Sequence, residues 1–127
     1  MRKGYTAFVI SADSRQNLLD HFPPKFPNVV CHHITMAFKV AEDTPLPANA
    51  SLRAIGYAAD PTGVEALVVE VDGSTERPSG GTFHVTLSLA DGRKPVESNN
   101  VIAQLGFVPL PEPVAIEATA TFIPFAS

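Results

Sequence analysis

Cysteine is nearly absent from this 127-residue sequence, and no apolar run is long. Because Cys31 is the one thiol, no internal disulfide can support the fold, and a reducing, cytoplasmic setting is expected. A membrane-spanning helix needs about 20 consecutive apolar residues, and the apolar run after Met1-Arg2-Lys3 is too short for a signal peptide. We therefore expect no association with a membrane.

Positive charge is also scarce. Nine Lys and Arg residues stand against thirteen Asp and Glu residues, which gives a formal net charge of −4. Tight binding of duplex nucleic acid requires a basic surface and is not expected here. Charged residues make up 17% of the chain and hydrophobic residues 45%, a balance typical of a folded protein rather than a disordered one. The length predicts a single domain, residues 1–127.

Strand-forming segments outnumber helical ones. Apolar runs bounded by turn residues predict strands at residues 5–10, 29–40, 52–59, 64–71, 82–89 and 114–123. One or two helices are expected, at residues 14–22 and 95–104, and the first must end before Pro23-Pro24. Asp60-Pro61-Thr62-Gly63 predicts a tight hairpin turn. The remaining prolines, including those of residues 109–113, are expected in connections.

One short pattern occurs twice, as His33-Ile34-Thr35 and His84-Val85-Thr86. Side chains of a strand point alternately to opposite faces, so the His and Thr of each copy share a face, roughly 6 to 7 Å apart. Ala37 and Ser88 are expected on these same faces, where a small residue leaves space. The alternation predicts that the opposite, core-facing set comprises His32, Ile34, Met36 and Phe38 in one strand and Phe83, Val85, Leu87 and Leu89 in the other.

At these two motifs the chain resembles the 2H phosphoesterase superfamily, whose members carry two His-x-Thr or His-x-Ser motifs on the central strands of a two-lobed α+β fold. The resemblance implies a compact α+β fold with a mainly antiparallel sheet. It also implies a metal-independent phosphodiesterase, without cofactor, that acts on a cyclic phosphate in an RNA end, a cyclic nucleotide or a short cyclic oligonucleotide. The catalytic residues that it implies are His33, Thr35, His84 and Thr86.

The chemistry of these residue types supports the same activity. Hydrolysis of a phosphodiester needs a base for the attacking water and an acid for the departing oxygen, and two histidines can serve near neutral pH. Threonine hydroxyls can donate hydrogen bonds to the phosphate oxygens as their negative charge grows. The sequence does not distinguish the acid from the base.

Three further residues are candidates for binding the substrate, and each has a plainer interpretation. Tyr5 could stack on a base, although a Tyr that opens a strand often lies at the edge of a core. Lys94, beside Arg93, could attract a phosphate or could belong to a solvated turn. Ser98 could contact the substrate or cap a helix.

Two other functions remain open, and the oligomeric state is not predicted. Cys31, His33 and His84 could form a zinc site, but their spacing matches no common zinc pattern and leaves both threonines unexplained. A non-catalytic module could use the same pocket to bind a nucleotide or a protein. The plainest alternative is that the histidines are half-buried strand residues with no role in chemistry.

Overall fold

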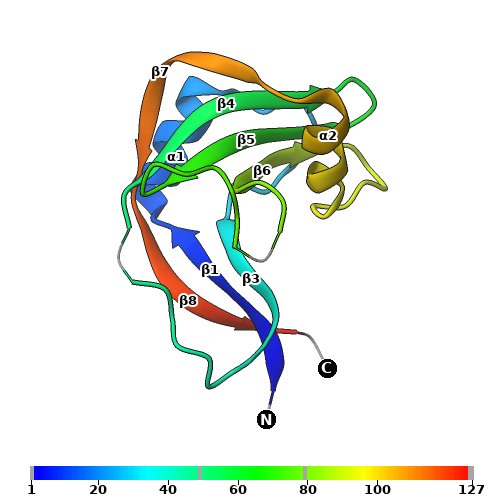
Figure 1. Cartoon of the computed structure of the whole chain (residues 1–127). Helices are drawn as coiled ribbons and strands as arrows, with labels where there is room; N and C mark the ends of the chain where they lie inside the picture. Colours follow the sequence, from blue (N-terminus) through cyan, green and yellow to red (C-terminus); the bar gives the residue numbers. More distant parts are fainter. Residues whose placement is uncertain (1, 49, 79, 126–127) are drawn as a thin grey trace.

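The fold is α+β, as the sequence predicts (Figure 1). The computed structural model describes residues 2–48, 50–78 and 80–125. In chain order the elements are β1 (Lys3–Ile10), α1 (Ala12–His21), β2 (Asn28–Val29), β3 (His33–Ala41), β4 (Leu52–Asp60), β5 (Val64–Val71), β6 (His84–Leu89), α2 (Glu97–Leu105), β7 (Val108–Ile116) and β8 (Ala118–Pro124). No helix of the described ranges is long and apolar enough to cross a membrane.

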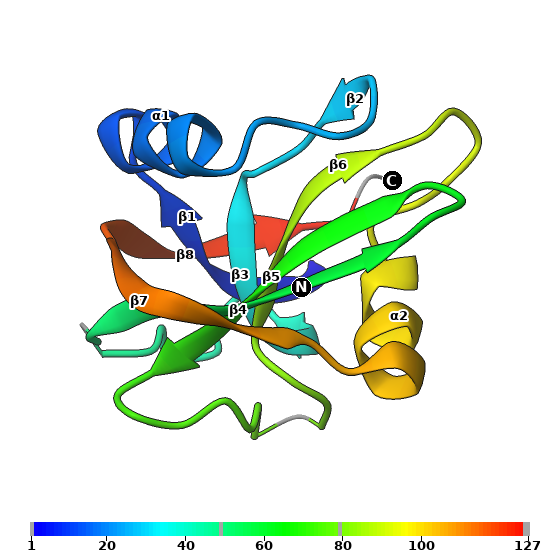
Figure 2. The same ribbon diagram turned by 90° about the horizontal axis from the view of Figure 1, so that it is seen from above.

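The strands form two antiparallel sheets. A three-stranded sheet has the order β3-β1-β8, and a five-stranded sheet has the order β2-β6-β5-β4-β7. Figure 1 shows the smaller sheet below the larger one, so the molecule has two lobes. The two helices lie at opposite sides of the molecule (Figure 2).

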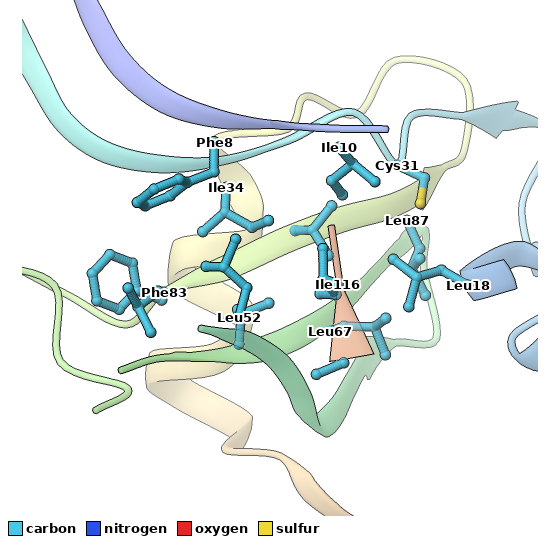
Figure 3. Close-up of a cluster of buried hydrophobic side chains, with 14 residues drawn as sticks. Phe8, Ile10, Leu18, Cys31, Ile34, Leu52, Leu67, Phe83, Leu87 and Ile116 are labelled. Atoms are coloured by element: carbon cyan, nitrogen blue, oxygen red, sulfur yellow. The ribbon is translucent and has the colours of Figure 1, made fainter. Parts of the chain in front are cut away.

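The larger sheet is covered on both faces. Leu67 and Val69 of β5 belong to the main hydrophobic core together with Phe8 and Ile34 of the smaller sheet (Figure 3). On the other face of β5, Val64, Ala66 and Val68 pack with Val101 and Ile102 of α2. Burial of each Val or Leu side chain contributes roughly 1.5 to 3 kcal/mol, which explains why the central strand carries Val, Leu and Ala on both of its faces.

The hairpin between β4 and β5 and the position of α1 follow local chemistry. Asp60 accepts hydrogen bonds from the backbone N–H and the hydroxyl of Thr62, and the backbone turns at Gly63, as predicted. The first helix begins at Ala12, two residues earlier than expected, because the hydroxyl of Ser11 caps it by accepting from the N–H of Ser14. The second helix covers Glu97–Leu105 rather than residues 95–104.

The predicted strand at residues 29–40 is wrong, because two strands in different sheets share this segment. β2 pairs with β6 of the larger sheet, and β3 pairs with β1 of the smaller one. The backbone changes direction at Cys31, whose φ of 44° is incompatible with a strand. His32 therefore lies outside β3 and is exposed, which corrects the expectation that it packs in the core.

The predicted C-terminal strand at residues 114–123 is also wrong, since β7 and β8 replace it and the prolines of residues 109–113 lie within β7. β7 is an edge strand, where a missing N–H can face away from the neighbouring strand. Its pairing with β4 has two parts, one at Val108 and Pro109 and the other at residues 114–116. Pro111 and Pro113 fall between them, so no ladder hydrogen bond is lost there.

Candidate active site

The two His-x-Thr motifs face the same way in adjoining strands of different sheets. Ile34 and Val85, the middle residues of the motifs, are fully buried in the main core. His33 and Thr35 of β3, like His84 and Thr86 of β6, point to the opposite side. β3 and β6 contact each other although they belong to different sheets, so the two motifs lie next to one another.

A cavity of about 360 Å³ opens where the two motifs meet. This volume lies in the range usual for small-molecule sites. The cavity contains both histidines and both threonines of the motifs, together with Tyr5, one of the three candidates for substrate binding. Its complete lining is Tyr5, Val30, His33, Thr35, Phe38, Arg77, His84, Thr86, Pro95, Val96 and Asn99.

Phe38 lines this cavity because β3 contains an extra residue. Thr6 pairs with Ala37 and Ala7 pairs with Thr35, so Met36 forms a bulge and the alternation of side chains is reversed after it. Phe38 consequently shares the side of Thr35 and is 57% exposed, whereas the sequence placed it in the core. Ala37, expected beside Thr35, does not line the cavity.

β6 has a matching bulge. Ala66 pairs with Thr86 and Glu65 pairs with Ser88, which makes Leu87 the extra residue. Ser88 is fully buried and donates to the carboxylate of Glu65 instead of lining the cavity. Leu89, expected in the same core as Val85 and Leu87, packs in the α2 cluster instead.

His84 presents its Nε2 nitrogen as an acceptor. Its Nδ1 lies 2.8 Å from the carbonyl oxygen of Thr82, which can only accept, so Nδ1 carries the hydrogen. Burial lowers the pKa of His84, and the positive charge of Arg77 lowers it further, while the bond to Thr82 opposes both effects. A neutral imidazole with a bare Nε2 is the form that can act as a general base.

His33 is also neutral near pH 7. Burial is the main cause that lowers its pKa to about 4, and His32 and His84 add electrostatic repulsion. Its Nδ1 lies 3.0 Å from Nδ1 of His32, and the two rings meet edge to face with their centroids 5.2 Å apart. The second ring nitrogen, Nε2, is therefore the one left for a substrate.

Ser98 lies behind the cavity and not in its lining, so the structure lends no support to the prediction that it binds the substrate. It is fully buried in the first turn of α2, and its hydroxyl is 2.8 Å from that of Thr86. It does not cap the helix, since the N-cap position is Val96. A donor bond from Ser98 to Thr86 leaves the Thr86 hydrogen free to turn toward a substrate or toward the carbonyl of Pro95, 3.4 Å away.

Arg77 supplies the positive charge of the cavity, and sequence analysis missed it. Its Nε donates to the carbonyl of Gly80 at 2.8 Å, and its Nη2 donates to the side chain of Asn99 at 3.2 Å. Backbone hydrogen bonds between Arg77, Gly80 and Gly81 close the loop that carries it. The signal available in the sequence was an arginine in a glycine-containing loop directly before the second motif.

Lys94 does not line the cavity, so the structure lends no support to the prediction that it binds the substrate. It is exposed in the turn before α2, where its backbone N–H donates to Glu97. Arg93 pairs with Asp60 and Glu97 in the same region. This segment is the solvated turn that the sequence analysis gave as the plainer interpretation.

An aromatic rim adjoins the cavity, and we define it as Tyr5, Phe38 and Phe125. The ring centroids of Tyr5 and Phe38 are 5.9 Å apart, and those of Phe38 and Phe125 are 5.1 Å apart. Phe125 is 38% exposed. The ring centroid of Tyr5 lies 5.3 Å from that of His33, so the rim reaches the first motif. Exposed aromatic faces beside a cavity that also holds polar groups can stack on a planar ring of a ligand.

The zinc alternative is not supported by the arrangement of its three residues. Cys31 is fully buried in the main core, where it packs near Ile10 and Leu87 (Figure 3), while His33 and His84 line the cavity. Within residues 2–48, 50–78 and 80–125, no group of three or more His, Cys, Asp or Glu side chains could hold a metal ion.

The fold, unlike the sequence, is similar to that of a known protein. No protein-family model and no curated protein sequence matches this chain. A solved structure described as "Crystal Structure of Fungal RNA Kinase" matches with a TM-score of 0.60 at 10% sequence identity. The match covers 98% of this chain and 44% of the fungal protein, so the chain spans less than half of that protein's length. At this identity the match shows a shared fold alone.

Proposed function

We propose that this protein is a metal-independent phosphodiesterase that hydrolyses a cyclic phosphate carried by a nucleoside, a short oligonucleotide or an RNA end. One observation carries the proposal, namely that two imidazoles, two hydroxyls and the guanidinium of Arg77 line a single cavity. These groups match the needs of the reaction, which are a base, an acid and donors for a phosphate whose negative charge increases.

The reaction needs two proton transfers. One histidine takes a proton from water as the water oxygen bonds to phosphorus. The bond from phosphorus to the ester oxygen then breaks, and that oxygen takes a proton from the other histidine. Because the departing oxygen of a cyclic phosphate stays tethered to the sugar, both reacting positions remain near one phosphorus atom. Thr35, Thr86 and Arg77 would contact the other phosphate oxygens.

The aromatic rim supports a substrate that carries a base. Stacking of a base on an aromatic side chain contributes about 1 to 3 kcal/mol, and Phe38 presents an exposed ring at the cavity. The shared fold with a protein described as an RNA kinase agrees with a substrate of this class. The net charge of −4 and a cavity lining in which Arg77 is the one cationic side chain among the described residues favour a small nucleotide or a chain end over a long duplex.

The test is hydrolysis of 2′,3′-cyclic mononucleotides, cyclic dinucleotides and RNA with a cyclic phosphate end, all in the presence of a chelator. We expect turnover of at least one of them, and we expect His33→Ala and His84→Ala each to lower kcat about 100-fold or more. If the pair acts as a unit, the double variant loses little more than either single one. His21→Ala is the matched control, because His21 is exposed on α1, its ring nitrogen lies near the Asn17 carbonyl of the same helix, and it does not line the cavity.

Three outcomes separate the alternatives. Hydrolysis that survives in either cavity variant would refute the assignment of the site. Hydrolysis that disappears with chelator and returns with zinc would favour a metal enzyme. Binding of nucleotides without turnover of any substrate would favour the non-catalytic module.

A further inference from the structure

His32 makes the one side-chain hydrogen bond recorded for His33 within the described ranges, although it lies outside the cavity lining. The reversal of the backbone at Cys31 brings the two adjacent rings face to edge, an arrangement that a continuous strand would prevent. His32 is exposed, whereas His33 is half-buried at the cavity wall, where its ring lies against that of Tyr5.

The bond between the two Nδ1 atoms requires that one of them carries a hydrogen and the other does not. If His33 were the donor, neutral His33 would present a bare Nε2 to the cavity. His84 already presents a bare Nε2, because its Nδ1 donates to Thr82. Two acceptors would then meet an anionic phosphate, and neither could protonate the departing oxygen. If His32 is the donor, His33 carries its hydrogen on Nε2 and faces the phosphate as a donor.

We propose that His32 is a positioning residue that donates to Nδ1 of His33, so that His33 is the general acid and His84 the general base. This inference rests on the proposed function and adds to it a role for a residue outside the cavity. It also explains how His33 can serve as an acid while it is neutral, because the proton that it loses at Nε2 is replaced at Nδ1 from His32.

The protons balance over one turnover. Nε2 of His84 takes a proton from water as the water oxygen bonds to phosphorus. The ester oxygen leaves with the Nε2 proton of His33, and His33 takes the Nδ1 proton of His32. For these protons to balance, the proposal requires His32 to start with a hydrogen on both ring nitrogens. His32 and His33 are then neutral, and His84 is charged. Loss of a proton from His84 to solvent, uptake of one at Nε2 of His33 and return of the Nδ1 proton to His32 restore the starting state.

The other groups around His33 do not offer a competing partner. Tyr5 packs on it from β1, His84 lies across the cavity on β6, and Arg77 is the charged group of the loop before β6. Arg77 cannot accept a proton, and no Asp or Glu belongs to the cavity lining among the described residues. Within this set, His32 is the group bonded to His33 that can both donate and take up a proton.

Nitrogen-15 NMR of the imidazoles tests the inference without any substrate. Near pH 7 we expect His33 to carry its hydrogen on Nε2 and His84 to carry its hydrogen on Nδ1, and in His32→Ala we expect His33 to lose its preference for Nε2–H. A neutral His33 with its hydrogen on Nδ1 in the native protein would overturn the inference, whatever substrate the enzyme takes.

Kinetics provides the second test. We expect His32→Ala to lower kcat about 10- to 100-fold with little change in KM, and His32→Asn to recover part of the loss because its amide keeps a donor near the position of Nδ1. An aryl phosphodiester, whose leaving group needs no acid, should be hydrolysed almost as well by His32→Ala as by the native protein. Native kcat in both variants on a cyclic phosphate would refute the role of His32 while leaving the proposed function intact.

Discussion

The two threonine hydroxyls of the site are held differently. Thr86 is buried, with its hydroxyl bonded to that of Ser98. Thr35 is half-buried, and no hydrogen bond of its hydroxyl is recorded with another described residue. A side chain that serves only the substrate can be changed without cost to folding, whereas one that also has a buried partner cannot.

This difference leads to a prediction for Thr35. We expect Thr35→Val to lower kcat about 10- to 100-fold, since it removes a donor to the phosphate, and to leave the free energy of unfolding nearly unchanged. Thr86→Val should lower kcat similarly and also destabilise the fold by about 1 kcal/mol, because Ser98 loses its partner. Thr35→Ser is the matched control that keeps the hydroxyl. Native activity in Thr35→Val would remove this residue from the catalytic set.

At the scale of elements, short irregular segments rather than regular ladders place the cavity groups. The bulge at Met36 turns Phe38 to the cavity, and the turn at Cys31 brings His32 to His33. The loop between β5 and β6 carries Arg77, and a side-chain bond to Asn99 of α2 ties it down. Residues 31–38, the loop that carries Arg77 and the helix α2 thus meet at the start of β6, where His84 lies.

The Arg77 loop gives a prediction at this scale. We expect Arg77→Gln to raise KM about 10-fold or more, because it removes the positive charge from a partly buried position beside the phosphate. Asn99→Ala should raise KM less, since it removes one anchor of the guanidinium and leaves the charge. Arg93→Gln is the control, because Arg93 is a cation of an ion-pair network outside the cavity. Equal effects of Arg77→Gln and Arg93→Gln on KM would indicate a general charge effect.

At the scale of the whole molecule, the cavity depends on the packing of two sheets against one core. β3 and β6 contribute Ile34 and Val85 to that core from opposite lobes, and the cavity opens beside them. The histidines are therefore buried by the global fold, and their protonation is coupled to unfolding.

This coupling predicts a pH dependence of stability. The pKa of His33 is about 4 in the folded protein and lies below the ordinary value of 6.5, so between these values the unfolded chain binds more protons than the folded one. The stability contribution of neutral His33 is complete above pH 6.5 and is lost as the pH falls toward 4. We expect the Tm to fall over this range, and to fall less in His33→Gln. If the Tm of His33→Gln fell with pH as steeply as that of the native protein, the result would contradict the lowered pKa of His33. His21→Gln serves as the control.

Local chemistry was enough to predict part of this architecture. The β4–β5 hairpin depends on Asp60 and Gly63, and the end of α1 depends on the prolines that follow it, so both could be read from neighbouring residues. The shared direction of His33 and Thr35, and of His84 and Thr86, follows from strand alternation over three residues. These features need no contact between distant parts of the chain.

Other features depended on packing between segments far apart in the chain. The break at Cys31 arises because the chain crosses from one sheet to the other, and both bulges are defined by the strands opposite, so residue alternation misplaced His32 and Phe38. Arg77 reaches the cavity through a bond to a residue 22 positions away, and Ser98 lies behind Thr86 because α2 packs there. A periodic pattern carries no information on such partners, since they are chosen by the free energy of the whole fold.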